Sequence, residues 1–411
     1  MKKYSAILVA IALVLCMVFA SCAPVVEQVA SNLPTKQPTA TTPSQDVEDI
    51  LSANTQQNTV EQTPSKRPQA KPDYAPKGEY NKGVVLVKNK DGVKNSTLTS
   101  IFYKSVEQLY VGSSWYKITL KDNQDTEEAV KALASTEHFE KVDYDYIMQA
   151  DGEVQSVDIS GNGYAPDPDH LETLGVHKAW LNSGGNNHAP GGSPDVIVAV
   201  IDTGVDYNHE DLRNNIWYNS AEIPDNGIDD DSNGYIDDVR GWDCVSDDTD
   251  PMDDNGHGTH VAGIVAAENN KVGTVGVAFN CKVMVIKAGN SSGYFNNSDI
   301  AEAIQYAYMN GASVINMSFG GSNISIAVEE ALENAYNTTI LVAAAGDDSL
   351  CNYLSCPAHK PLGQVGVSYP AALPYVIGVM SCDNGGNYCS SFSNFDHYPF
   401  NNYEYDVVAP G

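Results

Sequence analysis

Residues 196–204 read Val-Ile-Val-Ala-Val-Ile-Asp-Thr-Gly, an apolar run that ends in a carboxylate. Its β-branched residues predict a strand buried on both faces. Further apolar runs, separated by amphipathic stretches, occur at 283–288, 314–317, 340–345 and 376–380. This alternation predicts a doubly wound α/β fold, a parallel sheet with helices on both faces.

A helix is expected from about Ser298 to Gly311, because its apolar residues recur at helical spacing and glycine favours a helix end. Those residues are Ile300, Ala303, Ile304, Ala307 and Tyr308. Ligands and catalytic groups gather at the carboxyl ends of the strands in such sheets. Candidate site residues are therefore expected just after each apolar run.

Asp202 stands at such a strand end and is followed by the small residues Thr203 and Gly204. Asp-Thr-Gly is also the active-site triplet of aspartic proteases, which need a second such triplet in an all-β frame. The sequence holds no second Asp-Thr-Gly and no Asp-Ser-Gly. The triplet therefore predicts a strand-end carboxylate and not an aspartic protease.

His257 lies between two glycines in the stretch 254–263, Asp-Asn-Gly-His-Gly-Thr-His-Val-Ala-Gly. Glycines on both sides let the backbone pass close and leave the imidazole open to a ligand. The apolar residues that follow predict a helix that starts here. For His260, one turn into it, we expect a buried, hydrogen-bonded core position in preference to a metal ligand.

Together the two segments resemble the subtilisin-like serine proteases, and the resemblance covers about residues 167–411. Ser318-Phe319-Gly320-Gly321 resembles the strand that lines the substrate and one wall of the S1 pocket. Residues 343–346, with Ala344, Ala345 and Gly346, resemble the other wall. Residues 369–371 (Tyr-Pro-Ala) and 406–411 (Asp-Val-Val-Ala-Pro-Gly) match later landmarks of the family.

The resemblance implies acyl transfer on polypeptide substrates by a subtilisin-like domain over 160–411. His257 would take the proton of an attacking serine, and Asp202 would fix the imidazole tautomer. Residues 77–150 would form the inhibitory propeptide, a small ferredoxin-like α+β domain removed by self-cleavage between Met148 and about Asp167. The S1 walls hold only small residues and Phe319, so we expect broad specificity for apolar P1 side chains.

Two departures from the family pattern matter. The family continues beyond the match to Gly411 toward Gly-Thr-Ser-Met-Ala, so we expect the nucleophilic serine outside this chain and the chain alone to be inactive. Asp347 stands where the family has an asparagine that donates to the oxyanion. An ionised carboxylate would repel that oxyanion, whereas a desolvated, protonated one could donate. A non-catalytic pseudoprotease is therefore an alternative.

The stretch 229–238 is an acidic loop with the D-x-D-x-N-G spacing of an EF-hand. It offers ligands at alternating positions, namely Asp229, Asp231, Asn233, Tyr235 and Asp237, with Asp238 next to the last. Arg240 occupies the twelfth position in place of the bidentate glutamate. We favour a structural Ca²⁺ site over a solvated loop, because so many carboxylates repel one another without a cation. A calcium-binding surface protein is a further alternative.

The N-terminal part predicts strands at 84–87 and 115–120 and a helix that begins at Asp125, which forms a capping-box pair with Glu128. A third strand follows, in which apolar residues alternate with acidic ones. The apolar residues are Val142, Tyr144 and Tyr146, and the acidic residues are Asp143 and Asp145. We expect the two carboxylates on the solvent face.

Residues 1–21 have the pattern of an export signal, with Lys2 and Lys3 ahead of an apolar stretch at 6–20. Cys22 follows a sequence that resembles a bacterial lipoprotein cleavage site, so a lipid anchor on Cys22 and plain secretion both remain open. Residues 22–76 are rich in Ser, Thr, Pro and Gln and predict a disordered linker.

The composition excludes several classes of protein. An apolar fraction of 42% excludes wholesale disorder, and the net charge of -30 makes nucleic acid a poor partner. Six further cysteines permit three disulfides, and closeness in sequence weakly favours 351 with 356 and 382 with 389. They are Cys244, Cys281, Cys351, Cys356, Cys382 and Cys389. Their spacing fits zinc knuckles poorly, even with His359 or His397 as ligands.

Overall fold

The structure is a computed structural model that describes residues 75–76, 78–90, 103–151, 171, 174–183, 191–347, 350–351, 360–361, 367–382, 393–394 and 405–410. The predicted signal peptide, Cys22 and most of the predicted linker lie outside these residues. Within them, no helix combines the length and the apolar character needed to cross a membrane. The described residues beyond Ala75 belong to one compact unit.

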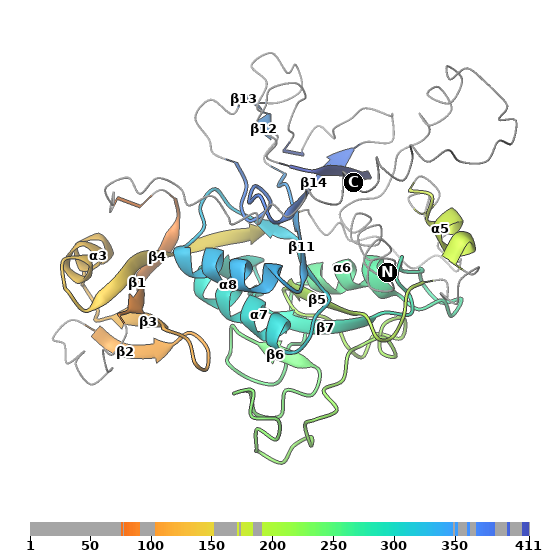
Figure 1. Ribbon diagram of the computed structural model, residues 1–411, viewed down its shortest axis with the longest axis horizontal. Helices are drawn as coiled ribbons and strands as arrows, with labels where there is room; N and C mark the ends of the chain where they lie inside the picture. Colours follow the sequence, from red (N-terminus) through yellow and green to blue (C-terminus); the bar gives the residue numbers. More distant parts are fainter. Residues whose placement is uncertain are drawn as a thin grey trace, which may run out of the picture. The chain divides into compact units, whose positions relative to one another are not determined.

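A seven-stranded sheet lies at the centre of the described residues, with the order β15-β14-β11-β9-β5-β7-β6, and every neighbouring pair in it is parallel (Figure 1). Its strands are β5 (Ile197–Asp202), β6 (Gly241–Asp243), β7 (Lys282–Lys287), β9 (Val314–Met317), β11 (Ile340–Ala344), β14 (Ile377–Cys382) and β15 (Val407–Pro410). Five of them fall on the five apolar runs. The short strands β6 and β15 were not predicted as strands.

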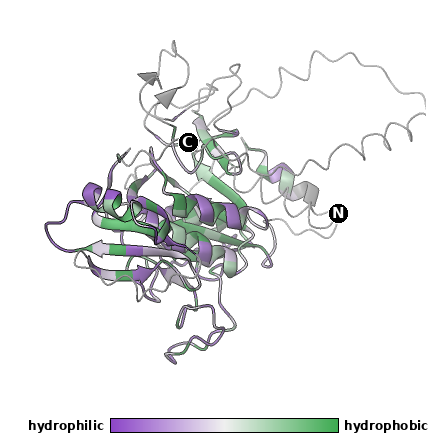
Figure 2. Ribbon diagram, turned by 60° about the vertical axis from the view of Figure 1, so that its left-hand side comes forward, coloured by the Kyte–Doolittle hydropathy of each residue, from purple (hydrophilic) through white to green (hydrophobic). Residues whose placement is uncertain are grey.

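Helices cover both faces of this sheet. They are α5 (Val176–Ser183), α6 (His257–Ala266), α7 (Asn297–Met309) and α8 (Ile326–Tyr336). Alternate residues of β5 enter two separate cores: Ala199 and Ile201 pack with α7 and α8, whereas Val198 and Val200 pack with α6. Figure 2 shows the apolar colouring concentrated on the strands. The doubly wound α/β prediction is confirmed.

The N-terminal domain is an antiparallel sheet with one helix among its described residues. Its order is β4-β1-β3-β2, built from β1 (Tyr80–Asn89), β2 (Tyr103–Gln108), β3 (Trp115–Leu120) and β4 (Phe139–Ala150). Helix α3 (Thr126–Ala134) starts where predicted, with the Asp125 carboxylate accepting from Glu128 N. β2 was not predicted. The far end of β4 pairs with β8 (Tyr294–Asn296) and β10 (Phe319–Gly320), which joins the two domains.

The expectation that Asp143 and Asp145 face solvent is wrong. Asp145 is fully buried and accepts a hydrogen bond from Ser298 N in the first turn of α7 at 2.8 Å. Asp143 Oδ2 accepts one from Ile326 N, the first residue of α8, at 2.9 Å. The first amides of a helix lack intrahelical partners and attract negative charge. The two carboxylates therefore dock β4 onto two helices of the other domain.

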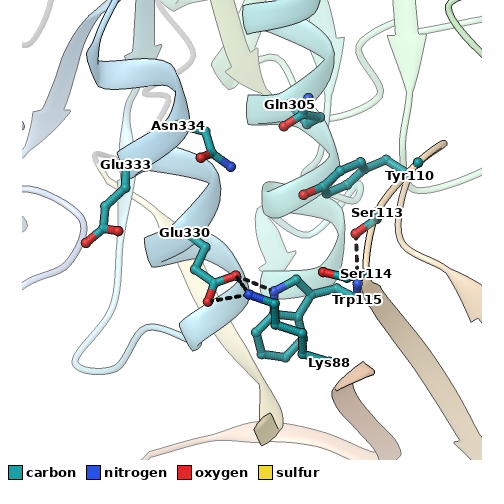
Figure 3. Close-up of a pocket in the computed structure, with 10 residues that line it drawn as sticks. Lys88, Tyr110, Ser113, Ser114, Trp115, Gln305, Glu330, Glu333 and Asn334 are labelled. Carbon is teal, nitrogen blue, oxygen red and sulfur yellow. Dashed lines mark hydrogen bonds and ion pairs between the residues drawn. The ribbon is translucent and has the colours of Figure 1, made fainter. Parts of the chain in front are cut away.

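Glu330 of α8 supports the same contact. Its carboxylate lies 3.0 Å from Lys88 Nζ of β1 and 2.8 Å from Trp115 Nε1 of β3. These groups sit at one end of a polar pocket of about 470 Å³ between the domains, in which Glu333 points away from the pair (Figure 3). The pocket is part of the interdomain contact.

Two of the six cysteines depart from the predicted disulfides. Cys244 and Cys281 are free thiols, and both are buried. Each packs in a hydrophobic core, Cys244 on the α7 side of the sheet and Cys281 on the α6 side, and free cysteine behaves as a small apolar residue there. The proposed pairs 351–356 and 382–389 involve residues outside the described part of the chain.

Candidate active site

Asp202 and His257 meet at the carboxyl edge of the sheet. Asp202 is the last residue of β5 and is fully buried, whereas His257 is the first residue of α6 and is 5% exposed. His257 Nδ1 lies 2.7 Å from Asp202 Oδ1. The structure thus brings together the two residues that the sequence analysis selected, at the predicted place in the fold.

The close approach of α6 to β5 requires glycine at position 258. A Cβ atom there would collide with the carbonyl oxygen of Gly204 and lie 3.0 Å from Asp202 Cβ. Gly256 just before the helix has a φ of 106°, a conformation that side chains disfavour. The two glycines that flank His257 in the sequence therefore shape the backbone of this turn.

Two residues that the sequence analysis did not select fix the turn. Asp253 accepts hydrogen bonds from Thr203 Oγ1 at 2.9 Å and from Thr259 N at 2.9 Å, which ties the end of β5 to the start of α6. Burial alone would raise the pKa of Asp253, but the hydrogen bonds from Gly256, Thr259 and Asn255 lower it below its usual value. Lys287 Nζ donates to Thr203 O at 2.8 Å from the end of β7.

The Asp202 carboxylate controls the protonation of His257. Burial of the imidazole would lower the pKa of His257, but the charge and hydrogen bond of Asp202 outweigh it and raise the pKa above its usual value. The carbonyl group of Asp151 acts in the same direction. A histidine held this way is oriented by one nitrogen and presents the other, Nε2, to a reacting group.

The end of β4 occupies the space in front of His257. The carbonyl oxygen of Asp151, one residue past the strand, lies 2.8 Å from His257 Nε2. Ala150 pairs with Phe319 and Gln149 with Gly320 in the antiparallel β4·β10 ladder. An extended segment of the chain thus lies beside His257 and pairs with β10 and β8, in the way that a peptide adds a strand to an open edge.

The residues of the two predicted S1 walls, 318–321 and 343–346, differ in what they contact. Ser318 O accepts from Asp151 N at 3.1 Å. Phe319 contributes only backbone: its side chain is fully buried and stacks on Phe295 at 4.5 Å between ring centroids. Gly320 faces the Asp151 side chain. On the other wall Ala344 and Ala345 are buried, and Gly346 has a φ of 95°.

Asp347 follows Gly346 at the end of that wall, and its side chain is exposed. The desolvated environment considered for this carboxylate is therefore absent. His260 is also exposed, so the expectation of a buried core position is wrong. The buried face of α6 runs through His257, Val261 and Val265, and His260 falls beside that face.

The acidic loop brings three carboxylates together at one place. Oxygens of Glu222, Asp231 and Asp238 lie within 4.8 Å of one another, and Glu222 and Asp238 are buried. Burial raises the pKa of Asp238 to about 6, against hydrogen bonds from Tyr306, Asn233 and Asn219. Sequence spacing could not find Glu222, because it precedes the loop. Three converging carboxylates fit a hard cation such as Ca²⁺.

The other predicted ligands have different partners. Asp229 accepts hydrogen bonds from Asn233 N and Gly234 N, at 3.1 and 2.9 Å. Asp237 accepts from Asn226 N and Gly227 N, at 3.0 and 2.9 Å. Asn233 Nδ2 donates to Asp238 at 3.0 Å, and the side chain of Tyr235 is buried in the core. These contacts shape the loop around the three carboxylates.

Comparison with known proteins identifies similar sequences and folds. Residues 193–411 match the model of the subtilase family, a group of peptidases. The chain is 32% identical over 341 residues to a thermophilic serine proteinase of Bacillus sp. (strain AK1), covering 82% of this chain and 71% of that relative. It is 36% identical to subtilisin DY of Bacillus licheniformis over 53% of this chain and 64% of that relative.

Among solved structures, the chain is similar to the epidermin leader peptide processing serine protease of Staphylococcus aureus, crystallised as a mutant. The TM-score is 0.55 at 24% identity, covering 80% of this chain and 76% of that chain. At this identity the likeness concerns the fold. The chain spans 26% of the length of another relative, subtilisin-like protease 1 of Plasmodium vivax, to which it is 41% identical over 162 residues.

Proposed function

The chain belongs to the subtilase family of serine proteases, and from this premise we propose that it is the precursor of an exported endopeptidase with an Asp202, His257 and serine triad. The serine is assigned to a segment after Gly411, in the family's Gly-Thr-Ser motif. Polypeptides are the proposed substrates, and they would add a strand to β10 in the groove.

In this mechanism His257 Nε2 removes the proton of the serine hydroxyl as its oxygen attacks a peptide carbonyl. Asp202 holds the neutral imidazole with Nδ1 protonated and stabilises the imidazolium that forms. Thr203 N donates to the buried Asp202 Oδ1 at 2.7 Å, which helps to hold the carboxylate in place against His257. Proton transfer of this kind contributes about 10²–10⁴-fold to rate.

The observation that carries the proposal is the line of contacts from Asp202 through His257 to a peptide carbonyl, 2.7 and 2.8 Å long. The test is to express the gene product to its natural end and treat it with a fluorophosphonate, which labels activated serines. We expect labelling of a serine after Gly411, and its loss in His257→Ala. The matched control is His260→Ala, since His260 is exposed on the same helix.

A wild-type protein that takes no label and cleaves no casein would contradict the proposal. That result would support the second candidate, a pseudoprotease that holds extended peptides without cutting them. Asp347 favours this candidate, because an ionised carboxylate at the position of the oxyanion donor would repel the intermediate. Peptide binding without cleavage would then be the measured activity.

The proposed cofactor is a structural Ca²⁺ bound by Glu222, Asp231 and Asp238. Oxygen ligands at such a site hold calcium at 2.3–2.6 Å with six to eight ligands, so backbone or water oxygens would complete the shell. Asn219, which donates to both Asp231 and Asp238 at 2.9 and 3.0 Å, supports the arrangement.

The proposed precursor has four parts. Residues 1–21 direct export, Cys22 carries a lipid anchor if the lipoprotein cleavage occurs, 22–76 form the linker, and 77–150 form the propeptide. The docking of Asp143 and Asp145 on two helices of the 160–411 domain supports an inhibitory role for the propeptide. Mass spectrometry of the exported protein would detect a lipid on Cys22 if the protein is a lipoprotein. An N-terminus without a lipid would indicate the secreted form instead.

A further inference from the structure

Lys287 is the last residue of β7, at the edge of the sheet where Asp202 lies. It is 4% exposed and directly follows the buried apolar residues of that strand. A buried lysine costs free energy unless its charge and its hydrogen-bond donors find partners. The partners of Lys287 therefore indicate what the charge does at this place.

The three donors of the ammonium group have acceptors in three different segments of the site. Lys287 Nζ donates to Thr203 O at 2.8 Å, just past β5, and to Gly289 O at 3.0 Å, where the chain leads to β8. The third acceptor is Asp254 Oδ1 at 2.6 Å, in the turn before His257. One side chain thus joins the end of β5, the turn before α6 and the segment that leads to β8.

Lys287 and Asp202 lie on the same face of the sheet. They are opposite each other in the parallel ladder of β5 and β7. Val200 and Val285, two residues earlier in each strand, both pack in the core on the α6 side. Because side chains alternate between the faces along a strand, the carboxylate and the lysine both belong to that side.

A second buried carboxylate lies on the other side of Lys287. Asp243 of β6 is opposite Lys287 in the ladder of β6 and β7, and it is 3% exposed. Burial raises the pKa of Asp243 above its usual value, whereas hydrogen bonds from Ser246 and Val245 and the charge of Lys287 act against that shift. The edge of three adjacent strands therefore carries two buried carboxylates with the lysine between them.

Asp202 requires a compensating charge when His257 acts as a base, because a general base is neutral. Thr203 N and His257 Nδ1 each lie 2.7 Å from Asp202 Oδ1. Oδ2 of the same carboxylate is buried and accepts no hydrogen bond from any residue that the structure describes. A buried anion with an unfilled oxygen costs free energy unless an opposite charge nearby offsets it.

We infer that Lys287 is a positioning residue of the proposed catalytic site: its ammonium group ties the Asp202, His257 and β8 segments together, and its charge compensates the buried Asp202 carboxylate while His257 is neutral. The inference rests on the proposed function, because it concerns the action of His257 as a base. Lys287 acts through the residues that it holds and transfers no proton itself.

The charge of Lys287 should also act on the pKa of His257. Burial lowers that pKa, but Asp202 outweighs burial and raises it. A further positive charge disfavours the imidazolium, so Lys287 acts in the same direction as burial. The other charged and titratable groups around this imidazole are Asp151 after β4, Asp253 and Asp254 of the preceding turn, and His260 of α6.

The test is the pH dependence of kcat/KM for Lys287→Met and wild type, both expressed to the natural end of the gene. Methionine has a similar length but neither charge nor donors. We expect the rising limb to move to higher pH by about 1 unit, as for a unit charge at an effective dielectric constant of about 20. We expect kcat to fall by about 10²-fold, since a displacement of about 1 Å can cost that much. A purely structural role would lower activity without moving the limb.

Two further variants separate the charge from the hydrogen bonds. Lys287→Arg keeps the charge, so the limb should stay in place while kcat falls, because a planar guanidinium does not reproduce the three ammonium contacts. Lys282→Met is the matched control at the other end of β7, where Lys282 Nζ donates to Asn214 O in an exposed position. It should keep both the limb and kcat.

Asp254→Asn keeps the inference testable if Lys287→Met does not fold, because the Asp254 side chain is 52% exposed. This change removes the counter-charge of the ammonium group and leaves an acceptor for it. The positive charge of Lys287 then acts more strongly on His257, so the limb should move to lower pH. An unmoved limb in a folded Asp254→Asn enzyme would count against the inference.

NMR titration of the His257 imidazole gives the same pKa without turnover and separates the two levels of failure. An unchanged or lowered His257 pKa in Lys287→Met would overturn this inference, whether or not the wild-type protein takes a fluorophosphonate label. A raised His257 pKa in a protein that takes no label would overturn the proposed function and leave the charge compensation of Asp202 standing.

Discussion

At the scale of single residues, the buried charge of Asp202 determines the state of His257. A fully buried carboxylate 2.7 Å from Nδ1 raises the pKa of His257 and fixes which nitrogen carries the proton. A general base works only when neutral, so activity should rise as the pH increases through that pKa. In the proposed mechanism, Asp202 therefore controls both the geometry and the pH range of the reaction.

We predict that Asp202→Asn lowers kcat by about 10⁴-fold, because the amide favours the wrong imidazole tautomer. The rising limb of the pH profile should also move to lower pH, since the charge that raises the His257 pKa is gone. The measurement is kcat against pH. Asp195→Asn, an exposed change near the start of β5, should leave the profile unchanged. An unshifted limb in Asp202→Asn would contradict this account.

Asp347 allows a gain-of-function prediction at the same scale. An oxyanion donor is typically worth about 10²–10³-fold in kcat. The resemblance to the family assigns the exposed Asp347 to the position of that donor. We predict that Asp347→Asn raises turnover at neutral pH by about 10²-fold in the complete gene product. Asp195→Asn again serves as the control. An unchanged kcat in Asp347→Asn would contradict the assignment of position 347 to the oxyanion donor.

At the scale of secondary-structure elements, β4 is the strand that connects the domains. Its Asp145 carboxylate lies at the first turn of α7, where Asn296 makes no side-chain cap. Burial is the main cause that raises the pKa of Asp145 to about 7, with the charge of Asp299 adding to it and hydrogen bonds from Ser298 opposing it. The contact between the domains therefore depends on pH.

The sign of this dependence follows from linkage. A carboxyl whose pKa is raised on folding binds its proton more tightly in the folded state, so its contribution is greatest below pH 4 and is lost as the pH rises toward about 7. We predict that the precursor's melting temperature falls over this range relative to Asp145→Asn, whose amide cannot ionise. A constant difference between the two proteins from pH 4 to 8 would refute the prediction.

Helix α8 provides a second prediction for the interface. Glu330→Ala removes the carboxylate that binds both Lys88 Nζ and Trp115 Nε1. The Glu330 side chain is 30% exposed. We expect the binding free energy between the N-terminal domain and the mature enzyme to weaken by about 1–2 kcal/mol. This is less than the full value of charged hydrogen bonds, because solvent screens the site. The measurement is inhibition of the mature enzyme by added residues 76–151. Glu333→Ala is the matched control on the same helix, since Glu333 is exposed. Equal inhibition constants for the two variants would contradict it.

The elements that could be predicted from the sequence share one property: neighbouring residues in the sequence indicate where they begin and end. Strand β5 ends in Asp202 because an apolar run precedes that residue, and α6 begins at His257 because glycines flank it. Asp145 and Glu222 have no such signal. Their roles depend on partners far along the chain, such as Ser298 for Asp145, and the strand pattern alone assigned Asp145 to the wrong face. The two-residue strand β10 is likewise defined only by its pairing with β4.

At the scale of the whole molecule, the acidic loop combines with a net charge of -30. The Glu222, Asp231 and Asp238 carboxylates are linked to the sheet domain through Tyr306 of α7, whose hydroxyl donates to Asp238 at 2.6 Å. A cation that neutralises these carboxylates would therefore stabilise the α7 side of the core as well as the loop.

We predict that EGTA lowers the melting temperature by about 5–10 °C relative to protein in which Ca²⁺ is present at about 100 times its Kd. Ligand at 100 times its Kd stabilises the folded state by about 2.7 kcal/mol, and each kcal/mol shifts the melting temperature of a domain of this size by about 2–4 °C. Glu222→Gln should melt at the EGTA temperature with or without calcium, whereas the exposed Glu210→Gln should respond like wild type. Because Mg²⁺ demands a stricter octahedral shell, it should restore less of the stability than Ca²⁺ does. If EGTA leaves the melting temperature unchanged, the prediction is wrong. Hydrogen bonds from Asn219, Asn233 and Tyr306 would then suffice to hold the three carboxylates together.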